Sequence, residues 1–240
     1  MRYYLEVVLD HCGAEVRLND IPVVRCGTGG ISARCCVNMW VIPGRNVLTL
    51  KQIPPQDLNS ESAANASVTL KKSVNNDPDR SVVLVARNLD FAEAFFDCNS
   101  SELPARPAWL DLHELTSPDI TAIRDFVREL HEAVQVGDCE KILKYVEPSL
   151  KAGAVAFGFD PQVHQERYRE LITSLFQDVN FQVSPLAESE FDFRLCGDGR
   201  MLSIVQSDGS DVIRSATDES GEWSLPMFIG MIDGKPFVVA

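Results

Sequence analysis

The chain of 240 residues has no long apolar run. A helix that crosses a membrane needs about 20 consecutive apolar residues, and no stretch approaches that length. The first residues, MRYYLE, also lack the apolar centre of a secretory signal peptide, because an acid follows within six residues. The sequence therefore predicts a protein without a membrane segment or leader.

Paired cysteines at metal-binding spacing are also missing. The seven cysteines are scattered and odd in number, and the four histidines show no ligand spacing to them. His11-Cys12 together with Cys35-Cys36 is the nearest approach to a zinc set, but neighbouring side chains on a strand point to opposite faces. We therefore expect reduced thiols, a cytoplasmic location and no metal or other cofactor.

Positive charge is scarce: 22 Lys+Arg face 35 Asp+Glu, which gives a net charge of -13. This balance argues against nucleic acid and against an anionic membrane surface. Residues 1–110 hold 12 acids and 11 bases, a net of -1, whereas residues 111–240 hold 23 acids and 11 bases, a net of -12. The division predicts two domains, of which the second would attract a basic protein partner.

The first 98 residues are predicted to form an antiparallel β-sandwich. Short β-branched or alternating segments recur between turn signals, without helical periodicity. We expect the first two strands to pair as a hairpin, because His11-Cys12-Gly13 between them is typical of a tight turn. The predicted strands cover residues 3–9, 14–18, 35–41, 47–51, 66–73 and 81–88.

Two stretches of this half, residues 14–23 and 41–50, resemble the strand pair of galactose-binding-like jelly-roll modules. The resemblance rests on the Asn19-Asp20-Ile21-Pro22 turn and on Pro43-Gly44-Arg45-Asn46. In such modules these turns join neighbouring strands. Asp20 stands where the family usually has glycine. The resemblance implies a β-fold and carries over no sugar-binding residue.

Residues 99–116 have the composition of a linker, and residues 117–240 are predicted to form an α+β domain. Ser117 and Pro118 predict the N-cap and first residue of one helix, which Gly137-Asp138 ends. A second helix is expected to break at Pro148, and a third to begin at Asp160-Pro161. Strands are then expected around 181–183, 191–195, 201–205, 212–214, 223–225, 228–231 and 237–239, with hairpin turns at Gly197-Asp198-Gly199 and Asp233-Gly234.

Three helices followed by antiparallel strands, with Gly221-Glu222-Trp223 before the last strands, resemble the nuclear transport factor 2-like (cystatin-like) fold. The resemblance implies a curved sheet packed against the helices, a cone-shaped pocket, and a possible homodimer through the sheet. It implies no single function, because this fold hosts enzymes and binding modules alike. Seven aromatic residues would line the pocket: Phe157, Tyr168, Phe176, Phe191, Phe193, Trp223 and Phe228.

Two functional hypotheses stay open. The first is a non-enzymatic interaction protein, since the charge and the two-part organisation resemble bacterial toxin-immunity or accessory proteins. Its acidic C-terminal domain would then contact a basic toxin. The expected contacts are Asp218, Glu219, Glu222, Glu188, Glu190 and Asp192.

The alternative is a small-molecule binder or polyketide-cyclase-like enzyme that uses the cone-shaped pocket. Its general base would be a carboxylate or histidine in an apolar setting. Glu190 and Asp192 alternate with Phe191 and Phe193, so the carboxylates and the rings should lie on opposite faces of a strand. We expect the rings to face inward and the carboxylates outward, and we assign no catalytic residue.

Overall fold

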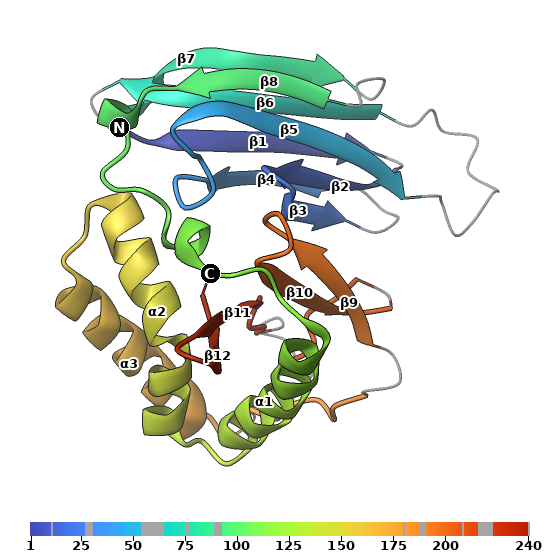
Figure 1. The fold of residues 1–240 in the computed structure, drawn as a ribbon, viewed down its shortest axis with the longest axis vertical. Coiled ribbons are helices and arrows are strands. Elements are labelled where there is room, and N and C mark those ends of the chain that lie inside the picture. The colour runs from blue at the N-terminus through green and yellow to red at the C-terminus, as the bar shows by residue number, and fades with distance from the viewer. Residues whose placement is uncertain are drawn as a thin grey trace. The chain divides into compact units, whose positions relative to one another are not determined.

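The computed structural model describes residues 1–10, 12–26, 31–53, 65–74, 77–88, 93–179, 181–187, 191–207, 209–215 and 223–239. These residues form an α+β protein with three α-helices and several antiparallel sheets (Figure 1). Contacts along the chain group it into two compact units, Met1–Pro107 and Ala108–Ala240.

Among its described residues, the first unit holds eight strands in two four-stranded antiparallel sheets. One sheet has the order β4-β1-β6-β7 and the other the order β3-β2-β5-β8. Buried apolar side chains from both sheets form a single core. The strands are β1 (Tyr3–Asp10), β2 (Gly13–Leu18), β3 (Ile21–Cys26), β4 (Ile31–Cys36), β5 (Gly44–Ile53), β6 (Asn65–Val74), β7 (Asp77–Asn88) and β8 (Glu93–Cys98).

The predicted hairpin between the first two strands is wrong. β1 pairs with β4 and β6, while β2 belongs to the other sheet. Both strands alternate apolar residues, such as Leu5 and Val7 in β1 and Val16 in β2, and bury them in the shared core. The pattern that indicates two strands therefore does not determine which strands pair. β3 and β8 are two strands beyond those predicted.

The predicted strand over residues 35–41 is also wrong in its position. β4 ends at Cys36, and Asn38–Trp40 form a turn. The buried Asn38 side chain replaces a strand partner, because its Oδ1 accepts a hydrogen bond from the Tyr3 amide at 2.8 Å. An asparagine that bonds the backbone in this way favours a turn over a continued strand.

Asn19 and Asn46 connect the two turns on which the jelly-roll resemblance rests. Asn19 and Asp20 have φ angles of 52° and 64°, as a tight turn between β2 and β3 requires. Asn19 Nδ2 donates to Asn46 Oδ1 at 2.8 Å, and Asn19 Oδ1 accepts from the Val47 amide at 3.0 Å. Asn46 is fully buried and also bonds the backbone of Ile42 and Gly44. The two asparagines therefore fix both turns to each other.

The second unit begins with η2 (Ala108–Asp111), whose Trp109 is buried, and contains α1 (Ser117–Gln135), α2 (Cys139–Phe157) and α3 (Pro161–Gln177). Thr116, one residue before the predicted N-cap, caps α1: its amide donates to the Asp119 carboxylate at 2.8 Å. Asp160 caps α3 as expected. α1 packs on α2 and β12, and α2 packs on α3.

The predicted break at Pro148 is wrong, because α2 continues through this residue. Proline removes one backbone donor from a helix. Here Ile142, Leu143, Val146 and Leu150 are buried on both sides of the proline, so packing holds the helix together.

A four-stranded antiparallel sheet follows, with the order β12-β11-β10-β9. Its strands are β9 (Phe191–Cys196), β10 (Met201–Gln206), β11 (Phe228–Ile232) and β12 (Lys235–Val238). Both predicted hairpin turns are confirmed: the first joins β9 to β10, and Asp233 and Gly234, with φ angles of 49° and 72°, join β11 to β12. The strands expected at 181–183, 212–214 and 223–225 are wrong, because these residues make only isolated bridges such as Arg214 with Ser224.

No helix among the described residues is long and apolar enough to cross a membrane.

Candidate functional site

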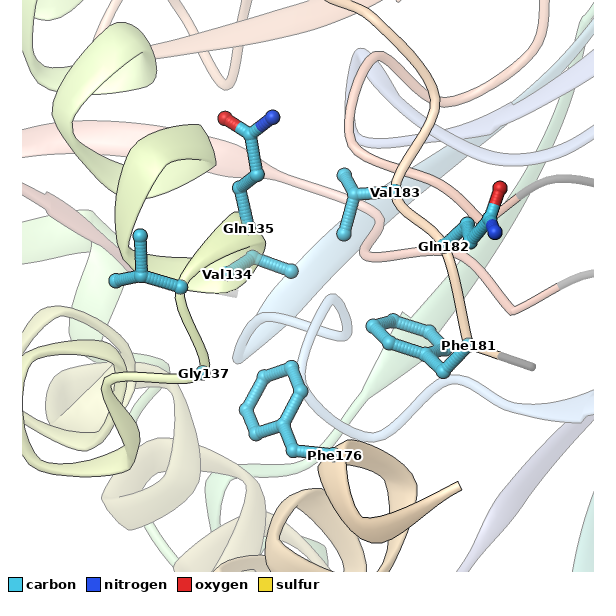
Figure 2. Close-up of a pocket in the computed structure, with 8 residues that line it drawn as sticks. Val134, Gln135, Gly137, Phe176, Phe181, Gln182 and Val183 are labelled. Atoms are coloured by element: carbon cyan, nitrogen blue, oxygen red, sulfur yellow. The ribbon is translucent and has the colours of Figure 1, made fainter. Parts of the chain in front are cut away.

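An open groove of about 580 Å³ lies at the end of α1 in the second unit (Figure 2). Residues 134–137 form one wall, and Phe176 with residues 181–183 forms the other. Figure 2 shows the rings of Phe176 and Phe181 turned toward each other, and their centroids are 5.6 Å apart in an edge-to-face arrangement. The lining residues are Val134, Gln135, Val136, Gly137, Phe176, Phe181, Gln182 and Val183.

The first wall is a tightly closed helix C-terminus. The Asp138 amide donates to the Ala133 carbonyl at 2.9 Å, and the Gly137 amide donates to the Val134 carbonyl at 3.2 Å. Gly137 has a φ of +70°, which this closure requires and which glycine adopts without strain. A Cβ at this position would lie 3.4 Å from the Phe176 ring, so glycine also lets the two walls approach closely.

The second wall is held in place by the elements around it. His131 Nε2 hydrogen bonds the Ser184 carbonyl at 2.9 Å, and the Ser184 amide donates to the Arg214 carbonyl at 2.8 Å. Trp223 supports Phe181 from its other side, with their ring centroids 5.7 Å apart. This wall is therefore fixed at several points.

The chemistry of the lining suits binding. Its side chains are apolar or carry an amide, and none of them titrates. Val136 on the groove is 77% exposed and leaves apolar surface in contact with water, although the groove as a whole presents more polar than apolar surface. Gln135 and Gln182, both exposed, can each donate and accept hydrogen bonds. Such a surface offers apolar contact and backbone recognition, but no acid, base or nucleophile.

The segments that form the groove are acidic. Residues 132–140 and 174–187 contain Glu132, Asp138, Glu140 and Asp178, and they contain no lysine or arginine. Arg169 of α3 pairs with Glu140. The Asp138 carboxylate caps α2 by accepting the Lys141 amide at 3.0 Å. The excess of acids in these segments makes them more favourable for a cationic ligand than for an anionic one.

Most of the acidic residues predicted to contact a partner lie outside the described residues: Glu188, Glu190, Asp218, Glu219 and Glu222. Asp192 is described, and its carboxylate pairs with Arg194 two residues along β9. Phe191 and Phe193 are half-buried against the core, while the Asp192 side chain is 38% exposed. Asp192 is half-buried like the two rings, and Leu195 on the rings' side of the strand is exposed, so the division into inward rings and outward carboxylates stays a prediction.

Of the seven aromatic residues expected to line a cone, Phe176 lines this groove and the other six do not. Tyr168, Phe191, Phe193 and Trp223 pack against the core of the second unit, and Phe228 of β11 is half-buried. Burial raises the pKa of Tyr168 to about 12. Among the other six, Trp223 comes nearest to the groove, through Phe181. The sequence did not identify Val134, Gly137 and Phe181 as lining residues. The signals that could have indicated them are the Gly137-Asp138 pair that ends α1 and the aromatic residues after α3.

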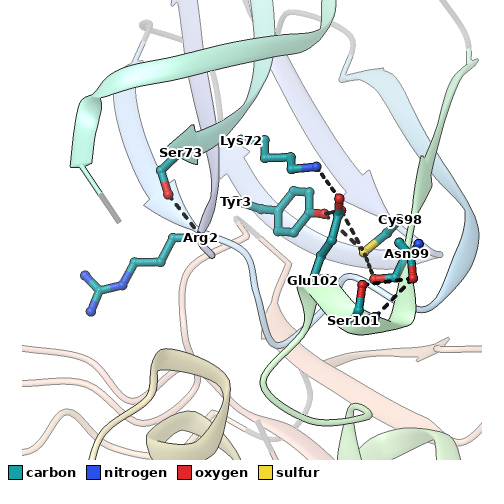
Figure 3. Close-up of polar contacts among 8 residues, drawn as sticks. All are labelled: Arg2, Tyr3, Lys72, Ser73, Cys98, Asn99, Ser101 and Glu102. Carbon is teal, nitrogen blue, oxygen red and sulfur yellow. Dashed lines mark hydrogen bonds and ion pairs between the residues drawn. The ribbon is translucent and has the colours of Figure 1, made fainter. Parts of the chain in front are cut away.

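A second group of reactive residue types lies in the first unit (Figure 3). The Tyr3 hydroxyl donates to Glu102 Oε2 at 2.6 Å and to Cys98 Sγ at 3.1 Å, and Lys72 pairs with Glu102. Burial raises the pKa of Tyr3 and that of the Cys98 thiol, so both protons are held. Hydrogen bonds from Lys72 and then Tyr3 lower the pKa of Glu102, which keeps it charged. These pKa shifts indicate that the hydrogen bonds among Tyr3, Cys98 and Glu102 have a structural role, and they oppose nucleophilic or basic chemistry.

Replacing Glu102 with glutamine should make the free energy of unfolding change less with pH across the acidic range. A carboxyl whose folded pKa is depressed contributes stability above its unfolded pKa and loses it as pH falls through the folded value. The gap in urea midpoint between the wild type and Glu102→Gln should therefore be widest at pH 7 and shrink toward pH 3. Glu93→Gln, at an exposed site on β8, is the control. A gap that is constant with pH would contradict the role of the charge.

Comparisons of the chain with protein-family models, with curated proteins and with solved structures gave no match. Within the described ranges, no group of three or more His, Cys, Asp or Glu side chains could hold a metal ion. The cysteines whose side chains are described are free thiols. The function of this protein is therefore inferred from the groove at the end of α1 and from the charge of the second unit.

Proposed function

We propose that this protein is a non-enzymatic binding module whose second unit holds a segment of a protein partner in the groove at the end of α1. The observation that carries the proposal is the lining: two exposed amide side chains and backbone groups present a mostly polar surface between valines and phenylalanines. Apolar contacts give affinity to an extended peptide, and amides can pair with its backbone.

The partner proposed is basic. Residues 111–240 carry a net charge of -12, and the segments that form the groove contain acids without lysine or arginine. Complementary charge would speed encounter and disfavour acidic competitors. An immunity protein that neutralises a basic bacterial toxin is the specific case that this charge and the resemblance to such proteins favour.

The finer architecture is part of the same proposal. We take residues 1–98 as a jelly-roll-like β-sandwich domain, supported by two antiparallel sheets that share one core. We take residues 117–240 as a nuclear transport factor 2-like domain, supported by three helices followed by a four-stranded antiparallel sheet. The cyclase-like alternative draws no support from this groove, because its lining offers no general base.

A peptide library tests the proposal. Random 12-residue peptides displayed on phage are selected on the full-length protein at low salt. We expect enriched sequences that combine lysine or arginine with apolar residues, and that bind less tightly as salt rises. Enrichment of acidic sequences, or no enrichment at all, would overturn it.

A further inference from the structure

A second groove in the same unit has a different chemistry. It has a volume of about 420 Å³ and lies where α1, α2 and β12 meet. Ala122, Asp125, Phe126 and Glu129 follow one face of α1, because residues three and four apart in a helix are neighbours. The lining residues are Ala122, Asp125, Phe126, Glu129, Lys144, Tyr145, Lys235, Pro236 and Phe237.

Aromatic side chains form the apolar part of this groove. The rings of Phe126 and Tyr145 meet edge to face with their centroids 4.8 Å apart, and Pro236 and Phe237 of β12 add further apolar surface. Phe126 is buried, whereas Tyr145, Pro236 and Phe237 are half-buried. A flat apolar ligand could therefore lie against fixed rings.

The carboxylates in this groove have side-chain partners, whereas the lysines have none among the described residues. The carboxylate of Asp125 pairs with Arg128 at 2.5 Å, and that of Glu129 accepts the Tyr145 hydroxyl at 2.8 Å. The side-chain ammonium groups of the two lining lysines, Lys144 and Lys235, make no ion pair or hydrogen bond with any residue that the structure describes. Lys141 adds a third cation, 5.8 Å from the centroid of the Tyr145 ring. The Glu129 carboxylate keeps its negative charge, because its partner Tyr145 is neutral, so the groove holds lysines without an ion-pair partner beside one uncompensated carboxylate.

We propose that this groove binds a small organic anion, namely a carboxylate attached to a flat apolar body. The carboxylate would pair with Lys144 and Lys235, and the apolar body would lie against Phe126, Tyr145 and Phe237. The same chemistry occurs in a free aromatic acid and at the C-terminus of a polypeptide that ends in phenylalanine. Because the two grooves share no lining residue, this site is independent of the proposed peptide groove.

The test uses 2-naphthoate as the probe, followed by amide chemical-shift changes in the full-length protein. We expect saturable binding that moves the Lys235–Phe237 signals, and binding of the neutral 2-naphthalenemethanol at least about tenfold weaker. Lys144→Gln and Lys235→Gln should each weaken 2-naphthoate by about threefold to tenfold. Lys151→Gln is the matched control, because this α2 lysine is 60% exposed and pairs with Glu147 away from the groove.

Equal binding of the charged and neutral probes would overturn the proposal, as would unchanged affinity in the Lys144→Gln/Lys235→Gln double variant. An acetylated Gly-Gly-Phe peptide with a free carboxylate separates the two sources. Tighter binding of the peptide than of 2-naphthoate would indicate a chain terminus, and the reverse would indicate a free acid. Because both lysines are exposed, we expect the variants to keep the wild-type urea midpoint.

Discussion

A lysine in place of Val136 should weaken the binding of groove-selected basic peptides by at least about tenfold, or roughly 1.4 kcal/mol. The wild-type valine is 77% exposed and ends α1 at the edge of the groove, so the new side chain has room and should not disturb folding. Lysine would place a like charge beside the basic peptide and remove an apolar contact. Isothermal titration with one selected peptide measures the change.

Val163→Lys is the matched control for this variant. Val163 of α3 is 51% exposed and does not line the groove, so the same substitution changes the net charge of the protein equally. This control should weaken peptide binding only through long-range electrostatic repulsion, and the effect should vanish at high salt. Equal losses in the two variants would show that the peptides respond to net charge alone, and the groove assignment would then be wrong.

Replacing Asn46 with alanine should destabilise the first unit by about 3 kcal/mol or more. The Asn46 side chain is fully buried and bonds the Ile42 amide, two carbonyls and the Asn19 amide group. Alanine would remove the partner of the half-buried Ile42 amide and carbonyl, at a cost of about 1–3 kcal/mol for each group that stays shielded from water. Urea denaturation measures the loss, and faster hydrogen exchange of the Val47 amide, which donates to Asn19 Oδ1, would locate it.

Asn88→Ala serves as the control for that experiment, since Asn88 is exposed at the end of β7. Its effect should stay within about 0.5 kcal/mol. If Asn46→Ala proved equally mild, the hydrogen bonds around Asn46 could not be what fixes the two turns.

Local features were predictable because short-range chemistry decides them. Helix ends and a hairpin depend on backbone angles and capping hydrogen bonds that nearby residues determine. Asp160-Pro161 and Gly137-Asp138 mark helix ends in this way, and Asp233-Gly234 marks a hairpin. The pairing of β1 with β4 and β6 was not predictable in this way, because alternation gives each strand a buried face without naming its neighbour. At Pro148 a local signal was misleading. Proline predicts a helix break, but tertiary packing on both sides of it keeps α2 continuous.

The grooves were harder to predict than the fold. The aromatic residues chosen from the sequence as a pocket, such as Phe191 and Phe193, mostly pack on the core, because apolar side chains fill space wherever neighbours allow it. The groove at the end of α1 depends on how Val136 and Phe181, which are 45 positions apart, come together. No periodicity in the sequence carries that information.

The contact between Tyr3 and Glu102 has a topological consequence. These residues stand near the two ends of the first compact unit, Met1–Pro107, yet their side chains are hydrogen bonded. The two ends of this unit therefore lie close together, as they do in many compact domains. A short linker could join the two ends and allow new termini elsewhere, or the whole unit could be inserted into a surface loop of another protein without forcing that loop apart.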